Sequence, residues 1–275
     1  MNNKIGDKTM RTQLSKLALA AAFGLALTFT FSCSSDDDGG GGGNSGGGTC
    51  NGSSGINGGN GKGNNIANYK TKRIGDQVWM AENLNYNVTG SRCYGECGQV
   101  FVGMNENEEP IMATLSNTEI KANCEKYGRL YDWATAMANS ASSFASPSGV
   151  RGVCPSGWHL PSGNEWKKLT DFIGGTFGTD TKLKATSGWN SYNEESGEKK
   201  GNGTDNYGFS ALPGGYSFSF PSGYFANVGE TGDWWTATEY DTNQAYRRVI
   251  GIRYNSVLSV QFDKKDLVSV RCVQD

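Results

Sequence analysis

Residues 39–65 of this 275-residue chain are almost entirely glycine, asparagine and serine, and this stretch limits which part of the sequence can fold. Such a segment has too little apolar surface to offset the entropy of ordering it. We expect a flexible linker, which as a random coil of ~25 residues spans about 25–30 Å on average. A hydrophobic core must then come from residues 68–275, which contain all seven tryptophans and suit one domain.

The segment before the linker has the features of a secretory signal. Four basic residues between Lys4 and Lys16 precede an apolar run over residues 17–31. This run is shorter than the ~20 apolar residues that a membrane-spanning helix needs, which disfavours the alternative of an uncleaved anchor helix. A basic start, a short apolar run and small residues before a cysteine are typical of signal peptides.

The end of this signal resembles a bacterial lipobox, Thr30-Phe31-Ser32-Cys33, with Thr30 where an aliphatic residue is usual. The resemblance implies that residues 1–32 are a lipoprotein signal peptide and that Cys33 is lipidated and anchors the chain in a membrane. Residues 33–67 would then hold the anchor and the linker, and residues 68–275 the domain. The residue after Cys33 is Ser34 and not Asp. By the same resemblance, this implies an outer-membrane lipoprotein of the cell envelope.

Charge excludes one class of partner. Removing residues 1–32 deletes four basic groups and one acidic group, which changes the formal net charge from −2 to −5. Nucleic-acid binding requires a basic stripe or patch. We find no such stripe and expect no nucleic-acid partner.

The cysteines predict disulfides in preference to a metal site. Six of the seven remain once Cys33 is assigned to lipid, and an even number in an exported protein favours pairing. Cys93 and Cys97 have the spacing of a metal-binding pair, but no second pair at similar spacing completes a zinc site. His159 is the single histidine, so a site built from several histidines is excluded. We predict no metal and no cofactor.

The expected strands suggest how the cysteines pair. Val268, Val270 and Cys272 alternate with polar residues, so Cys272 should face the core, and Cys154 begins a constrained extended segment. We therefore expect Cys154–Cys272. Cys93 and Cys124 flank an insertion-like loop over residues 98–116 and should pair next, which leaves Cys50–Cys97 as the third pair.

Local signals predict several elements in the domain. A hairpin is expected over residues 69–80, with its turn at Gly75-Asp76. Ser116-x-x-Glu119 and Ser162-Gly-Asn-Glu165 are capping boxes that should each open a helix. Strands are expected over residues 246–254, 258–262 and 268–272, whereas residues 187–235 should form long loops with short strands.

Several of these segments resemble the Fibrobacter succinogenes major paralogous domain. The resemblance rests on Tyr69 to Asn85, Cys124 to Ala134, Cys154 to Ser162, Gly208 to Tyr216 and Asp233 to Glu239. No biochemical activity is assigned to this family, which occurs on exported lipoproteins. The order around Leu160 to Trp166 is also similar to C-type lectin-like and formylglycine-generating-enzyme domains. The resemblance thus implies an α+β fold, with two main helices packed on a small twisted antiparallel sheet and long glycine- and aromatic-rich loops.

Aromatic side chains crowd the loop-rich region among its glycines. Their faces can stack on sugar rings, although the alternative is that most of them fill the core. We expect Trp234 and Trp235 to divide, one buried and one closer to the surface. The ligand-binding candidates are Trp189, Tyr216, Tyr224 and Trp234.

These features predict a non-catalytic binding or adhesion lipoprotein whose ligand is a polysaccharide or a cell-envelope protein. The alternative is an extracytoplasmic glycan hydrolase or oxidase that uses the same loops. Glu194-Glu195, or Asp233 with Glu239, would supply the paired carboxylates of a glycosidase. Adjacent glutamates on a polar loop are more typical of a solvated surface, and no nucleophile is indicated near His159. We therefore predict no catalytic residues.

Lipidation is directly testable. Metabolic labelling with a fatty-acid analogue should mark the wild-type protein and not Cys33→Ser, because only the Cys33 thiol can accept the diacylglyceryl group. Equal labelling of both proteins would contradict the lipobox assignment.

Overall fold

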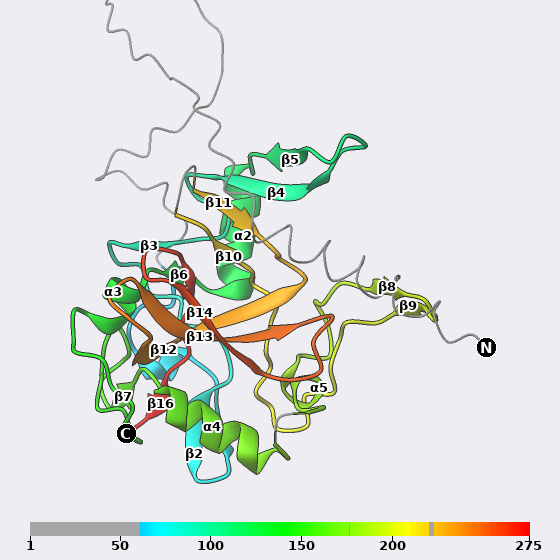
Figure 1. Ribbon diagram of the computed structural model, residues 1–275. Coiled ribbons are helices and arrows are strands. Elements are labelled where there is room, and N and C mark those ends of the chain that lie inside the picture. Colours follow the sequence, from blue (N-terminus) through cyan, green and yellow to red (C-terminus); the bar gives the residue numbers. More distant parts are fainter. Residues whose placement is uncertain (1–60, 176, 220–222) are drawn as a thin grey trace, which may run out of the picture. The chain divides into compact units, whose positions relative to one another are not determined.

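Residues 61–175, 177–219 and 223–275 are described by a computed structural model of the chain (Figure 1). The expectations for residues 1–32, Cys33 and Cys50 lie outside these ranges. Strands make up 32% and helices 16% of the structure, and the strands form four sheets. The fold is therefore β-rich, and the expected α+β arrangement of two main helices on one small sheet is wrong. The expected helices at the two capping boxes are present, but the segment expected as loops contains several strands, including the nine-residue strand Thr231–Glu239 within the largest sheet.

Most of the described elements are short, and only four strands have six or more residues and only two helices have ten or more. The helices are η1 (Ile66–Asn68), α2 (Asn117–Tyr127), α3 (Trp133–Met137), α4 (Gly163–Phe172) and α5 (Asp180–Leu183). The strands are β1 (Thr71–Ile74), β2 (Gln77–Met80), β3 (Ser91–Arg92), β4 (Gln99–Met104), β5 (Pro110–Ala113), β6 (Leu130–Tyr131), β7 (Trp158–His159), β8 (Tyr192–Glu194), β9 (Gly197–Lys199), β10 (Tyr216–Ser217), β11 (Tyr224–Ala226), β12 (Thr231–Glu239), β13 (Gln244–Gly251), β14 (Leu258–Asp263), β15 (Val268–Ser269) and β16 (Val273–Gln274).

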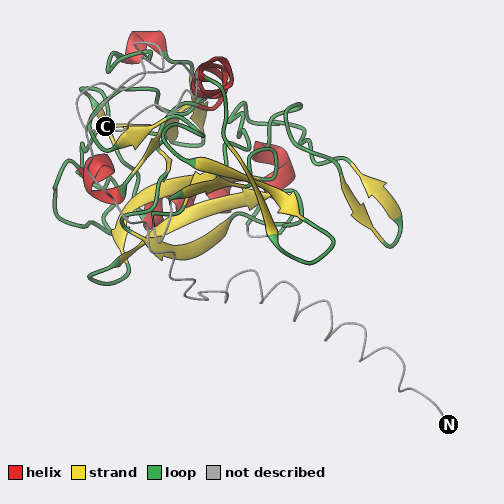
Figure 2. Ribbon diagram, turned by 90° about the horizontal axis from the view of Figure 1, so that it is seen from above, coloured by secondary structure: helices red, strands yellow, loops and turns green. Residues whose placement is uncertain are grey.

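The largest sheet has six strands in the order β14-β13-β12-β15-β6-β3. Its long strands β12, β13 and β14 are antiparallel neighbours, and β12 also pairs in parallel with β15. A second sheet, β1-β2-β16-β7, joins the first described strands to the last one. The third has the order β10-β11-β4-β5, and β8–β9 is a separate hairpin. Figure 2 shows the helices arranged around these strands.

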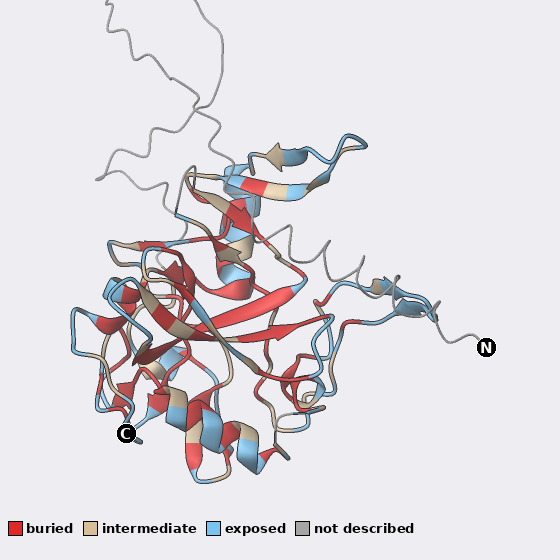
Figure 3. Ribbon diagram, viewed as in Figure 1, coloured by how far each residue is buried: buried red, intermediate tan, exposed pale blue. Residues whose placement is uncertain are grey.

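The core lies on both faces of β12, of which only Glu239 is not buried (Figure 3). Trp235 belongs to an apolar cluster with Tyr131, Cys154 and Val270. Trp234 points the other way, into a cluster with Trp79 and Trp166. Successive residues of a strand face opposite sides, so two adjacent tryptophans anchor two separate clusters. Both are fully buried, and the expectation that one would approach the surface is wrong.

The capping boxes and the first hairpin are confirmed. Ser116 and Ser162 each accept a hydrogen bond from the backbone of the glutamate three residues on, and both boxes are complete. Helix α4 buries Trp166 and Leu169 on one side, and Ile173 after its end is also buried. Within the described ranges, no helix is long and apolar enough to cross a membrane.

Two of the expected disulfides are present. Cys154 pairs with Cys272 across 118 residues, and Cys93 pairs with Cys124 across 31. In the chain-entropy model, closing the longer loop contributes about 4–5 kcal/mol of stability. Cys97 is disulfide-bonded as well, whereas its expected partner Cys50 lies outside the described residues.

Asn83 connects the segment after β2 to the centre of the largest sheet. Its Oδ1 accepts hydrogen bonds from Trp234 Nε1 at 2.8 Å and from Arg271 Nη2 at 2.8 Å. Its Nδ2 donates to the carbonyl of Tyr127 at 2.9 Å and to Ser269 Oγ at 3.2 Å. One buried amide therefore joins the segment after β2, the end of α2, β12 and β15.

Replacing Asn83 should destabilise the whole domain. Asn83→Ala leaves the Arg271 cation and the Trp234 N–H without their shared acceptor, and the expected loss is about 3–5 kcal/mol of unfolding free energy. Urea unfolding would measure it. Asn107→Ala, at an exposed turn, is the matched control and should change stability by less than about 0.5 kcal/mol. Near-wild-type stability of Asn83→Ala would contradict the role assigned to this amide.

Candidate functional site

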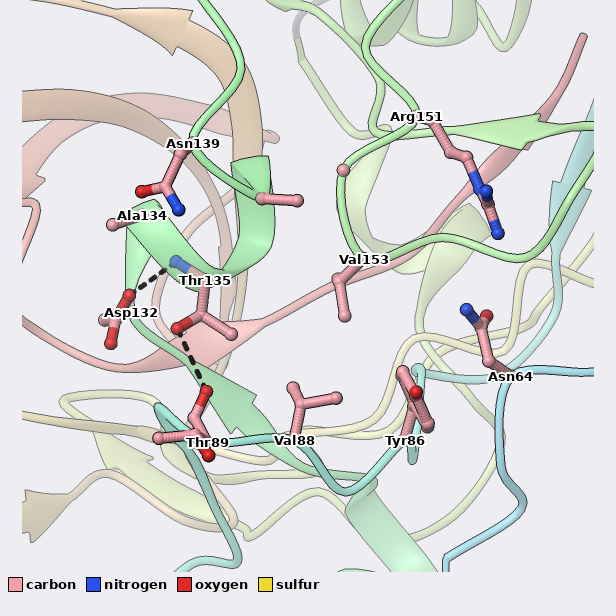
Figure 4. A pocket seen from close by; sticks show the side chains of 12 residues that line it. Asn64, Tyr86, Val88, Thr89, Asp132, Ala134, Thr135, Asn139, Arg151 and Val153 are labelled. Carbon is pink, nitrogen blue, oxygen red and sulfur yellow. Dashed lines mark hydrogen bonds between the residues drawn. The ribbon is translucent and has the colours of Figure 1, made fainter.

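A cavity of about 510 Å³ opens between the segment after β2, helix α3 and the loop before β7 (Figure 4). This volume lies within the range of about 300–1,000 Å³ that is usual for small-ligand pockets. We call it the α3 cavity. Its lining residues are Asn64, Tyr86, Val88, Thr89, Asp132, Ala134, Thr135, Ala138, Asn139, Arg151, Gly152 and Val153.

Close backbone approach builds the walls of the α3 cavity. Asp132 caps α3, and its Oδ1 accepts from the Thr135 backbone N–H at 2.7 Å. A Cβ at Gly90 would lie 2.0 Å from Thr135 Oγ1, so only glycine lets the 86–90 segment approach this helix. Gly152 has φ +54°, and a Cβ there would lie 2.1 Å from the Ala136 carbonyl oxygen.

The lining is polar at two ends and apolar between them. Asp132, Thr135 and Asn139 lie at one end, and the side chains of Asn64 and Arg151 extend toward each other at the other (Figure 4). Val88 and Val153 lie between the two ends, and the partly exposed ring of Tyr86 completes the lining. Amide, guanidinium, carboxylate and hydroxyl groups thus surround an apolar middle, which is the usual composition of a small-molecule site.

Two features of the lining cost stability. Asn64 Oδ1 is buried and has no hydrogen-bond partner, although Nδ2 of the same amide is 3.5 Å from the Cys154 carbonyl. Ala138 and Asn139 are consecutive residues with positive φ, +48° and +59°. Each such residue other than glycine costs about 1–3 kcal/mol, and strain of this kind concentrates at functional sites. Both features mark this cavity as a site to be tested.

Two of the four ligand-binding candidates are core residues, which corrects the expectation for Trp189 and Trp234. Trp189 is 5% exposed, and its Nε1 donates to the Ala211 carbonyl while Lys184 lies over its ring. Trp234 is 0% exposed and bonded to Asn83. Their burial follows from the strand β12 and the loop over residues 184–211, which pack them against α4 and its neighbours.

The other two candidates are brought together. Tyr216 and Tyr224 are half-buried, and each contacts Phe218 with ring centroids 5.0 Å apart. The Arg247 guanidinium lies over the Tyr216 ring, and Arg247 is itself paired with the buried Asp233 at 2.8 Å. Burial raises the pKa of Tyr216 and of Asp233, and Arg247 opposes the shift in Asp233. This arrangement packs the rings against charged groups, and none of its residues lines the α3 cavity.

The single histidine is part of a buried network. His159 Nε2 lies 2.7 Å from Glu165 Oε1, and Nδ1 lies 2.8 Å from Asp275 Oδ1. Glu165 Oε2 accepts from the backbone N–H groups of Ser148 and Ser162. Both ring nitrogens are occupied and the side chain is 2% exposed, so His159 cannot reach a substrate in this conformation.

The carboxylates considered for hydrolysis are dispersed. Asp233 is buried against Arg247, whereas Glu239 pairs with Lys264 at 2.8 Å. Glu194 and Glu195 are exposed on the β8–β9 hairpin. In the part of the chain that the structure describes, no group of three or more His, Cys, Asp or Glu residues could hold a metal ion.

Comparison with known proteins identifies the family. A family model, the Fibrobacter succinogenes major domain, matches residues 73–274. The chain belongs to this family. No curated protein and no solved structure matches the chain.

Most of the α3 cavity lies within the Fibrobacter succinogenes major domain. Asn64 alone precedes the matched range. Residues 61–67 were assigned to the linker by composition, yet the Lys62 backbone N–H donates to the Asn85 carbonyl, and Tyr69 Oη donates to the Gly63 carbonyl. Sequence reasoning missed this cavity because its residues come from four separate segments. The local signal there is the segment Cys124 to Ala134, which belongs to the family resemblance and contains Asp132 and Ala134.

The His159 network should make stability depend on pH. Burial alone lowers the pKa of His159, but Glu165 and Asp275 together outweigh burial and hold that pKa above its usual range. The protonated imidazole therefore stabilises the fold fully below about pH 6.5, the pKa expected for an unfolded histidine, and this contribution is lost as the pH rises through the folded pKa. Urea unfolding between pH 5.5 and pH 9 should show this loss in the wild-type protein.

The variant His159→Gln has no imidazole and should lack this part of the pH dependence. Asp275→Asn, which removes the solvent-facing partner, should retain a smaller pH effect. Identical pH profiles for wild type and His159→Gln would contradict the raised pKa.

Proposed function

We propose that this protein is a non-catalytic binding module of the cell envelope and that it holds a saccharide in the α3 cavity. The observation that carries the proposal is the composition of that lining. Donors and acceptors lie at both ends of an apolar middle formed by Val88 and Val153, and the partly exposed ring of Tyr86 is part of the lining. A sugar presents hydroxyl groups at its rim and apolar C–H groups on its ring face, which an aromatic ring can cover.

The polar groups suit hydroxyl groups better than a charged ligand. Asp132 accepts hydrogen bonds and Arg151 donates them, while Asn64 and Asn139 can do both. Asp132 and Arg151 carry opposite charges at the two ends, so this pair gives the lining no net charge that would select an anion or a cation.

A position outside the cytoplasm fits this proposal. The signal-like segment, the expected lipid at Cys33 and the glycine-rich linker would place the domain at a membrane surface, where polysaccharides are accessible. The disulfides of the domain suit an oxidising compartment.

Binding can be tested with the purified protein on insoluble cellulose, xylan and peptidoglycan, and by calorimetry with their soluble oligomers. Tyr86→Ala should weaken binding of the recognised glycan by about 1–2 kcal/mol, which is roughly 5- to 30-fold. Asn139→Gly should also weaken it while preserving the fold, because glycine accepts the +59° φ at this position. Arg151→Gln removes the cation at the other end of the α3 cavity and should weaken binding as well.

Tyr254→Ala removes an exposed aromatic ring away from the cavity and should bind like the wild type. Melting temperatures of all variants separate lost binding from lost folding. Wild-type affinity in all three cavity variants would refute the α3 cavity as the site. Release of reducing sugar that depends on cavity residues would favour the hydrolase instead.

A further inference from the structure

A second hollow, also of about 510 Å³, lies between α4 and the outer strands of the six-stranded sheet. We call it the α4 groove, and it has no lining residue in common with the α3 cavity. Its residues are Phe144, Gly163, Asn164, Lys167, Thr170, Asp171, Thr238, Tyr246, Arg248, Val257, Leu258 and Ser259.

The register of the sheet places Arg248 in the wall of this groove. Arg248 lies opposite Trp234 on β12 and opposite Ser259 on β14. Trp234 faces the apolar cluster under α4, so Arg248 lies on the same face of the sheet as that helix. Arg248 Nη2 donates to the carbonyl of Gly163, the first residue of α4, at 2.8 Å.

The Arg248 guanidinium has no anionic partner. Among the described residues no carboxylate forms an ion pair with it, and its Nε is buried without a hydrogen-bond partner. Burial lowers the pKa of Arg248 to about 10, which still leaves it protonated at neutral pH. The other charged residues of the groove, Lys167 and Asp171, are exposed and pair with each other at 2.6 Å. An uncompensated cation therefore lies in a hollow that is open to a ligand.

Aromatic and hydroxyl groups surround this cation. Tyr246 is two residues before Arg248 on the same face of β13 and packs edge-on against Tyr240, which is 53% exposed. Phe144 is 58% exposed at the groove. Thr170 and Ser259 add hydroxyl groups, and Asn164 adds an amide.

We propose that the α4 groove binds a uronic acid residue of an acidic polysaccharide, with its carboxylate paired to Arg248 and its ring against Tyr246 and Phe144. A carboxylate matches the planar guanidinium and would supply the missing counter-charge. The rings and hydroxyl groups favour a sugar over an acidic peptide, which would need backbone partners as well. This inference shares the saccharide class with the proposed function but depends on different residues.

The test is calorimetry of the full protein with trigalacturonate and with its fully methyl-esterified form. The ester keeps the sugar rings and removes the charges, so it should bind at least tenfold more weakly than the acid. Arg248→Gln should lose at least tenfold in affinity for the acid and little for the ester. Its melting temperature should not fall greatly, because the substitution removes an unpaired, largely buried cation.

A second variant blocks the groove without removing the cation. A Cβ at Gly163 would lie 3.5 Å from Arg248 Nη2, in ordinary contact, so Gly163→Glu can place a carboxylate beside the guanidinium. Glutamate is favourable in the first turn of a helix, and the fold should be retained. Gly163→Glu should lose at least tenfold in trigalacturonate affinity, whereas Gly163→Ala, the matched control, should bind like the wild type.

Tyr86→Ala should leave trigalacturonate binding unchanged, which separates this proposal from the one on the α3 cavity. Four results would each overturn the inference: no measurable binding of trigalacturonate, equal affinity for acid and ester, wild-type affinity in Arg248→Gln or Gly163→Glu, or stronger binding of a glutamate-rich peptide than of trigalacturonate.

Discussion

The fold depends on how it accommodates a buried cation, Arg271, which is fully inaccessible to solvent. The guanidinium hydrogen-bonds to neutral oxygens, Oδ1 of Asn83 and the carbonyls of Phe209 and Ser210, and it stacks 4.2 Å from the Phe209 ring. Desolvation lowers the pKa of Arg271 to about 9. Every segment that supplies an acceptor must stay in place, because an unpaired buried charge costs several kcal/mol. The cation thereby fixes the 81–85 and 208–211 segments against the last strands.

Single polar side chains bond to several distant segments at once in this fold. Asn83 serves Arg271 and Trp234 at once, and Glu165 serves His159 while its other oxygen closes a capping box. Each polar side chain therefore determines the position of more than one element. The disulfide Cys154–Cys272 acts in the same region of the chain, since Cys272 directly follows Arg271. Covalent and polar constraints converge on the last strands, which lie beside both the first hairpin and the centre of the largest sheet.

Rules based on neighbouring residues predicted the helix caps correctly. They failed for strands and buried side chains whose positions depend on tertiary contacts. The capping boxes at Ser116 and Ser162 were visible because a cap involves only four consecutive residues. Cys272 is buried as strand alternation predicted, but Ser269 and Arg271 beside it are buried as well, so alternation does not describe this segment. Strand β12 was missed because both of its faces are buried, which removes the alternation that identifies a strand. The same burial made Trp234 resemble a surface aromatic in a glycine-rich loop. Neither cavity could be predicted, since each is assembled from separate segments by the fold.

Two adjacent arginines show how the structure separates roles that the sequence cannot. Arg247 and Arg248 are consecutive on β13 and therefore face opposite sides of the sheet. Arg247 is paired with the buried Asp233 and lies 3.6 Å from the Phe262 ring, so its contacts account for its presence. Arg248 has a single hydrogen bond, to the Gly163 carbonyl, and the carboxylate that lines the groove, Asp171, is paired with Lys167 instead. An aliphatic residue at position 248 would fill the same wall without an unpaired cation. No contact within the described fold therefore requires the positive charge of Arg248, whereas binding of an anion would require it.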